Sequence, residues 1–218
     1  MQSSVFTLRD FCDVAMQKSE SDIRINAVEC TTKAKEAYSD ADKQVEKAAK
    51  FAQEAKVNQK GDQPFSCSNG EGTFQGFRRG DFVLGETQCM DGRKFLGGVD
   101  KRNGDRAGTF FERGSTFMGS FYGCDQISFS GSVRKGTSLF MGSQNALCKR
   151  GRWYFNNGGI FEGEQDLDTG IVNGGFLIDG VVYVGSSKGP LMRLSQHKSE
   201  LITDSTIDEG VLKKIKKY

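Results

Sequence analysis

The chain has 218 residues, of which 36% are hydrophobic, 28 are glycine and two are proline, and its formal net charge is +2. So few apolar residues disfavour one large globular core but suit a repeat domain, in which each unit buries one face against its neighbours. No apolar run approaches the ~20 residues of a membrane-spanning helix, and no secretory leader pattern is present. We expect a cytoplasmic protein, with or without membrane association, or a secreted or periplasmic one if the N-terminus shown is already processed.

Residues 1–60 contain no glycine or proline and are rich in Ala, Lys and Glu, which predicts a helical segment. From Ile23 to Ala55 the apolar residues recur every three or four positions, as in a coiled-coil seam with one stutter. An earlier stripe is out of phase with that seam, so one long helix and a helical hairpin both fit. The seam predicts either a lid on the chain's own β-domain or self-association through Ile23–Ala55.

Residues 61–64 form a predicted linker, and residues 65–187 carry a repeat of 22 residues. The repeat is marked by turn glycines, which are Gly70, Gly92, Gly114, Gly136, Gly158 and Gly180. Each is followed by an aromatic-x-glycine triplet, namely Phe74/Gly76, Phe95/Gly97, Phe117/Gly119, Phe140/Gly142, Phe161/Gly163 and Tyr183/Gly185. Asn-Gly and Asp-Gly are strong hairpin signals. The fold class predicted is therefore mainly β with helical flanks: an elongated antiparallel meander of stacked hairpins.

This pattern resembles the MORN repeat family, with about six units over residues 65–187. Residues 159–185 and 93–114 carry the resemblance best, and Phe stands where the family usually has Tyr. The resemblance implies a long curved antiparallel sheet that serves as a scaffold and is sometimes associated with membranes or phospholipids. A second, shorter resemblance joins residues 153–158 to the cell-wall-binding repeats of secreted bacterial proteins. Those repeats bind choline or sugars through several aromatic rings, whereas this chain has one tryptophan.

Residues 188–218 form a C-terminal extension whose last part predicts a short amphipathic helix. Thr206 and Glu209 have the spacing of a capping box, and apolar residues follow at helical spacing up to Ile215. The lysines of this segment, Lys213, Lys214, Lys216 and Lys217, lie on its other side. We expect the helix to cap the last hairpin or to lie on an anionic membrane.

Cys67 and Cys89 each lie three residues before a turn glycine, where later repeats have Phe or another apolar residue. We therefore expect both to be small core residues. Their equivalent places in successive hairpins are about 10 Å apart, too far for a disulfide. A bridge between Cys124 and Cys148 stays open.

Catalytic and metal sites are not expected. The single histidine, His197, lies in a polar stretch with no nucleophile motif around it. Glu164, Asp166 and Asp168 alternate as in a calcium loop, but the closing glutamate is missing. We expect these acids to be solvated at a hairpin tip, and we expect no cofactor.

Basic residues concentrate in the middle of the chain and in its tail. Those in the middle are expected on or near hairpin loops, and loops aligned along one edge of the sheet would form a basic stripe able to meet phosphates. The candidate binding residues for an anionic phospholipid or an acidic partner are Arg78, Arg79, Lys101, Arg102, Lys149, Arg150, Arg152, Lys213, Lys214, Lys216 and Lys217. No aromatic platform is interleaved with them, so nucleic acid is not expected.

Together these features predict a non-enzymatic scaffold or adaptor that binds proteins through its sheet and its N-terminal helix. The alternatives are a peripheral module that binds anionic phospholipid and a secreted glycan-binding or adhesin-like repeat protein.

Overall fold

The computed structural model describes residues 8–70, 72–122, 128–178, 181–187, 191–194 and 199–202. Its helix, α1, runs without interruption from Leu8 to Glu54, so the N-terminal segment is one long helix and not a hairpin. The strands are β1 (Gln63–Asn69), β2 (Gly72–Arg79), β3 (Phe82–Cys89), β4 (Lys94–Asp100), β5 (Arg106–Glu112), β6 (Ser115–Tyr122), β7 (Ser128–Lys135), β8 (Ser138–Gln144), β9 (Cys148–Tyr154), β10 (Ile160–Asp166), β11 (Val172–Ile178), β12 (Val181–Ser186), β13 (Leu191–Leu194) and β14 (Ser199–Ile202).

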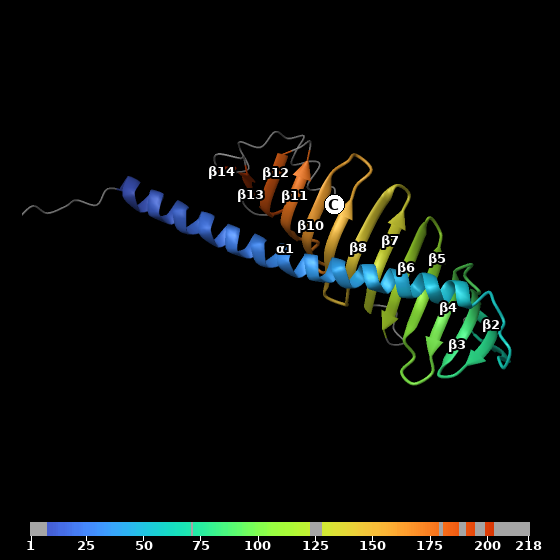
Figure 1. Cartoon of the computed structure of the whole chain (residues 1–218). Helices are drawn as coiled ribbons and strands as arrows, with labels where there is room; N and C mark the ends of the chain where they lie inside the picture. The colour runs from blue at the N-terminus through green and yellow to red at the C-terminus, as the bar shows by residue number, and fades with distance from the viewer. Residues whose placement is uncertain are drawn as a thin grey trace, which may run out of the picture.

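These strands form one antiparallel sheet in which each strand pairs with the next along the chain. The sheet is long, twisted and open, with β1 at one end and β14 at the other, and α1 lies along it (Figure 1). The turn glycines Gly70, Gly92, Gly114, Gly136 and Gly158 lie at hairpin tips, and Gly92 and Gly114 have the positive φ that favours glycine. The predicted antiparallel meander is confirmed.

The sheet extends beyond the predicted repeat domain. The repeat pattern ends at residue 187, yet β13 and β14 add two more strands. Neither contains glycine or an aromatic residue, so the pattern could not reveal them. At the other end β1 begins at Gln63, inside the predicted linker. The predicted C-terminal helix and its lysines lie outside the described residues.

A ladder of glycines crosses the middle of the sheet. One glycine from each strand between β2 and β12 stands directly opposite the glycine of the next strand: Gly76, Gly85, Gly97, Gly108, Gly119, Gly131, Gly142, Gly151, Gly163, Gly174 and Gly185. Directly opposed residues of an antiparallel pair point to the same face. The aromatic-x-glycine triplets supply every second rung, and the intervening strands supply the others.

The ladder makes room for aromatic rings. A Cβ added to Gly163 would lie 2.7 Å from the ring of Phe161 two residues earlier, and one added to Gly97 would lie 3.0 Å from the ring of Phe95. The rings therefore lie flat over the glycines and pack against one another. Phe161 stacks on Phe176 with their centroids 4.7 Å apart, and both are almost fully buried. The core is thus a layer of rings on the ladder face of the sheet.

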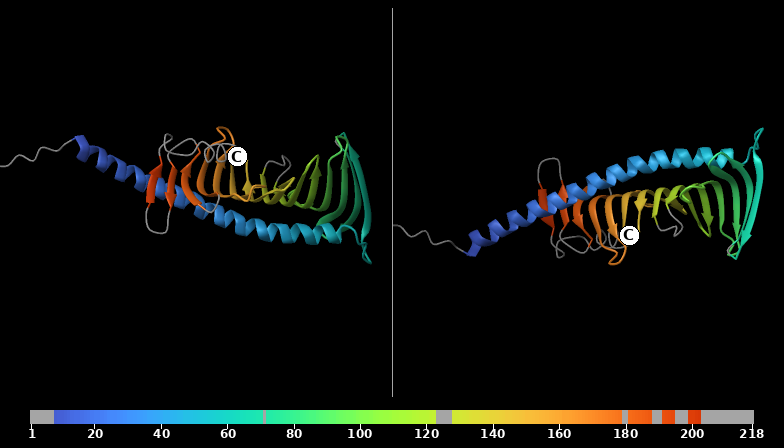
Figure 2. Two further views of the ribbon diagram at one scale, coloured as in Figure 1. Left: turned by 90° about the horizontal axis from the view of Figure 1, so that it is seen from above. Right: turned by 90° about the horizontal axis from the view of Figure 1, so that it is seen from below.

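The opposite face carries α1, which crosses from β3 to β13 (Figure 2). Ala34, Ala41 and Ala48 are fully buried in this contact, one every seven residues. The sheet meets them with small residues, including Ala107, Ser120 and Ser130. The helix can approach the sheet closely because both contribute small side chains to the contact. For these residues the predicted seam is therefore a lid on the chain's own sheet.

The prediction that Cys67 and Cys89 belong to one apolar core column is wrong. Cys67 is exposed, and two later members of that column, Phe111 and Leu177, are 42% and 36% exposed. The number of residues between a hairpin tip and the paired glycines can differ by one between repeats. Residues at the same distance from the tip then point to different faces of the sheet in those repeats. Cys30, Cys67, Cys89 and Cys148 are free thiols.

Candidate functional site

Two of the predicted basic site residues at the hairpin tips, Arg79 and Arg102, are engaged with the chain's own carboxylates. Arg79 donates to Asp62 at 2.7 Å and lies 3.6 Å from Glu54 at the end of α1. Arg102 donates to Asp100 at 2.6 Å. That hydrogen bond and the backbone N–H of Arg102 lower the pKa of Asp100 to about 2. These arginines therefore anchor loops and the helix end.

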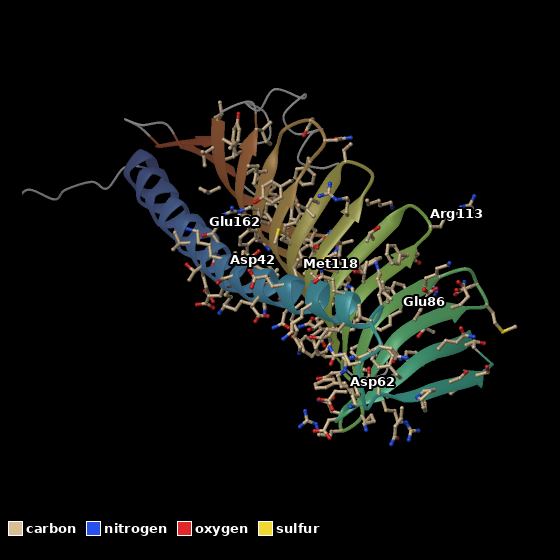
Figure 3. The ribbon with its side chains drawn as sticks, turned by 45° about the vertical axis from the view of Figure 1, so that its right-hand side comes forward. Asp42, Asp62, Glu86, Arg113, Met118 and Glu162 are labelled. Atoms are coloured by element: carbon tan, nitrogen blue, oxygen red, sulfur yellow. The ribbon has the colours of Figure 1, made fainter. Side chains whose placement is uncertain are left out.

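The basic residues near position 150 lie on strand β9 and not on a loop, contrary to the sequence interpretation. Arg150 and Arg152 point to the helix face and pair with Glu164 and Glu162 of β10. The guanidinium of Arg152 also lies 4.7 Å from the ring centroid of Tyr38 in α1. Basic β9 and acidic β10 thus neutralise each other beneath the helix. Figure 3 shows Glu162 on this side of the sheet.

The remaining predicted residues do not complete a stripe. Lys149 lies on the ladder face, 4.7 Å from the ring centroid of Phe140, and burial lowers its pKa. Arg78 covers the ring of Phe65 at 4.5 Å, and Lys101 is exposed at a tip. The structure brings Arg79 and Arg102 to neighbouring hairpin tips and leaves the others apart. The tail lysines lie outside the described residues.

The N-terminal end of α1 projects past the last strand of the sheet (Figures 1 and 2). The dark-blue turns extend beyond β14, where no other described element lies beside them. We call the part of α1 that precedes the Ile23–Ala55 seam, residues 8–22, the projecting end. Leu8, Phe11, Cys12 and Ala15 recur there at helical spacing. The sequence predicted an apolar stripe of Val5, Leu8, Cys12 and Ala15 by its change of phase, without Phe11, and no local pattern indicated that this stretch lies outside the sheet.

A row of half-exposed apolar residues runs beside α1 at the same end of the molecule. It lies on the helix face of β8 to β12, and its members stand opposite one another from strand to strand. We call Leu139, Tyr154, Ile160, Leu177 and Val182 the flanking patch. Leu177 and Val182, 36% and 39% exposed, are the most exposed members of the row.

A groove of about 330 Å³ opens on the ladder face at the other end, over β1 to β5. Its walls are mainly the rings and aliphatic side chains of Phe65, Phe74, Val83, Phe95, Val99 and Phe110. The cause is local: in the aromatic row Thr87 stands between Phe74 and Phe95, where the neighbouring strands have rings. Its smaller side chain leaves the hollow.

Two arginines lie at the margins of the groove. Arg93 pairs with Asp91 at 2.5 Å and lies over the ring of Phe110, so its charge is compensated. Arg106 is half-buried and forms no hydrogen bond or ion pair with any residue that the structure describes. Sequence reasoning missed Arg106 because it counted paired basic residues, and Arg106 is a single basic residue between Asp105 and Ala107.

The described residues contain no cluster of His, Cys, Asp and Glu that could hold a metal ion. Asp166 of the calcium-like stretch caps its own loop instead, accepting from the backbone N–H and the hydroxyl of Thr169 at 2.7 and 2.8 Å. His197 lies outside the described residues. No helix in the described part of the chain is long and apolar enough to cross a membrane.

Comparison with family models, with curated proteins and with solved structures finds no match to this chain.

Proposed function

We propose that this protein is a non-enzymatic scaffold that assembles with a second copy of itself through the projecting end of α1. The observation that carries the proposal is the continuation of α1 beyond the sheet that supports the rest of it. In proteins most of the stability of a helix comes from packing its apolar face against another element, and this part of α1 has no such surface on its own sheet. Residues 8–22 therefore gain stability from a surface that their own sheet does not provide.

The flanking patch supplies such a surface on another copy. Residues 8–22 span about 22 Å at 1.5 Å per residue, which is about four strand spacings. A two-fold axis normal to the sheet beside β14 would lay each projecting end along the α1 of the other copy. The projecting end of one copy would then cross β14 of the other copy and reach its Val182 on β12 and Leu177 on β11, the exposed end of the flanking patch. The contact is isologous and closes as a dimer.

The alanine seam cannot make this contact, because Ala34, Ala41 and Ala48 are already buried on the chain's own sheet. Self-association through the whole of Ile23–Ala55, as the sequence suggested, would require α1 to leave the sheet. The projecting end requires no such rearrangement.

Sedimentation velocity tests the proposal with four proteins at the same concentration. The full chain should sediment as a dimer, whereas a chain beginning at Ile23 and the variant Leu177→Lys/Val182→Lys should sediment as monomers. Leu167→Lys is the matched control, since Leu167 is 38% exposed but lies at a hairpin tip outside the patch. This control should remain a dimer. A monomeric full chain at tens of micromolar would reject self-association.

A further inference from the structure

We infer that the groove over β1 to β5 is a binding site for a small apolar carboxylate, such as a medium-chain fatty acid. This inference does not depend on the proposed dimer, because the groove lies at the opposite end of the sheet and on the opposite face from the flanking patch.

The size of the groove sets the size of the ligand. Its volume of about 330 Å³ is at the lower end of the range of about 300–1,000 Å³ that is typical of small-molecule sites. The hollow lies where Thr87 interrupts the aromatic row, so it has fixed walls on both sides. Phe95 beside it is almost fully buried and cannot swing out to fill it without exposing the core. A small molecule fits this site better than a long polypeptide.

The walls of the groove set the body of the ligand. Phe65, Phe74, Phe95 and Phe110 contribute ring surface, and Val83 and Val99 contribute aliphatic surface. Polar groups are few, and the thiols of Cys67 and Cys89 are weak donors. Removing apolar surface from water is the main driving force for occupying such walls. The body of the ligand is therefore a hydrocarbon chain or ring.

Arg106 sets the head group. A half-buried guanidinium with no partner among the residues that the structure describes favours an anion, and its planar fork of donors matches a carboxylate bidentately. One uncompensated positive charge suits a monoanion. A phosphate dianion would need a second cation to balance its charge, but the charge of Arg93 is already offset by Asp91. The carboxylate is thus the head group that leaves neither partner with unbalanced charge.

The pairing of β4 with β5 also leaves room for the apolar body of the ligand. Arg106 lies two residues before Gly108, and Arg93 lies four residues before the opposed Gly97 on the antiparallel neighbour. The two arginines are therefore six residues apart along the strand direction, or about 20 Å. A carboxylate held at Arg106 would have its chain directed across the rings toward the Arg93–Asp91 pair.

Calorimetric titration with dodecanoate and with dodecanol, both kept below the concentration at which they aggregate, tests the inference. We expect the full chain to bind dodecanoate at least about tenfold more tightly than dodecanol. Only the carboxylate of dodecanoate forms charged hydrogen bonds with Arg106, and one such bond raises affinity by about this factor. Arg106→Gln should remove this preference and leave the affinity for dodecanol unchanged. Arg106→Lys, which keeps the charge but not the fork, should retain part of the preference.

Two further variants separate the groove from general effects. Thr87→Phe should abolish binding of both ligands by filling the hollow, and its circular dichroism should match that of the parent chain. Arg134→Gln is the matched control, because Arg134 is exposed near the end of β7 and does not line the groove over β1 to β5. It should bind like the parent. The inference is overturned if dodecanoate does not bind, if Arg106→Gln keeps the preference, or if Thr87→Phe binds normally.

Discussion

At the scale of single residues, the glycine ladder decides how closely neighbouring strands and rings can pack. A glycine of the ladder has no room for a Cβ atom, whereas a glycine beside the ladder can have room for one. A Cβ on Gly163 would lie 2.1 Å from the carbonyl oxygen of Asn173 and 2.7 Å from the Phe161 ring. A Cβ on Gly175, on the helix face of the paired strand, would meet its nearest atom, in Thr31, at 3.6 Å. The first position forbids a methyl group and the second accepts one.

We therefore expect Gly163→Ala to lower the free energy of unfolding by about 2 kcal/mol or more, because overpacking forces strand and ring apart. Gly175→Ala should change it by less than about 1 kcal/mol. Urea denaturation of both variants provides the measurement. Equal stability of the two variants would contradict the role assigned to the ladder.

Asp100 makes the stability of the β4–β5 tip depend on pH. Its folded pKa of about 2 lies below the ordinary value of about 3.9. The carboxylate therefore stabilises the fold fully above about pH 4, and this contribution is lost as the pH falls toward 2. Arg102→Gln should return the pKa of Asp100 toward its ordinary value, as measured by NMR titration of the side-chain carboxyl carbon. An unchanged pKa would mean that Arg102 is not its cause.

At the scale of elements, α1 and the sheet fit because both contribute small side chains. Hydroxyls of Ser120 and Ser130 donate to Gln44 and Asp40 of the helix at 2.7 Å, which fixes the helix above β6 and β7. The Phe51 ring packs against Phe82 at the other end. The helix is thus positioned by a few polar contacts along a narrow apolar seam.

Ala41→Leu should separate helix and sheet and cost about 1–3 kcal/mol of stability, because Ala41 is fully buried. Ala49→Leu provides the control, since Ala49 is on the same helix but exposed, and a leucine there is an equally good helix former. Thermal unfolding followed by circular dichroism would compare them. If Ala41→Leu were as stable as Ala49→Leu, the seam would not be closely packed.

Much of this arrangement could be predicted from local sequence signals. Turn glycines and aromatic-x-glycine triplets located the hairpins, because both report the conformation of the few residues around them. The second glycine of each repeat, such as Gly108 or Gly131, follows no fixed spacing from the tip and emerged only from strand pairing. Arg106 and Thr87 belong to the candidate site through their cross-strand neighbours, which no local pattern encodes.

At the scale of the whole molecule, the basic and acidic stretches of the sequence pair with each other within the sheet. The basic and acidic stretches of the sequence meet where β9 pairs with β10, and their arginines and glutamates neutralise each other there. The electrostatic stripe suggested for membranes is therefore reduced to isolated cations among the described residues. The features left for a partner are the projecting end of α1, the flanking patch and the groove.

The central claim is that the projecting end of one copy lies on the flanking patch of another. Photo-crosslinking from a benzophenone side chain placed at Phe11, in an equal mixture of ¹⁴N- and ¹⁵N-labelled chains, tests it most directly. We predict crosslinks of mixed isotope composition that map to β10 to β12. Crosslinks confined to single chains, or none at concentrations where the protein is intact, would contradict the account.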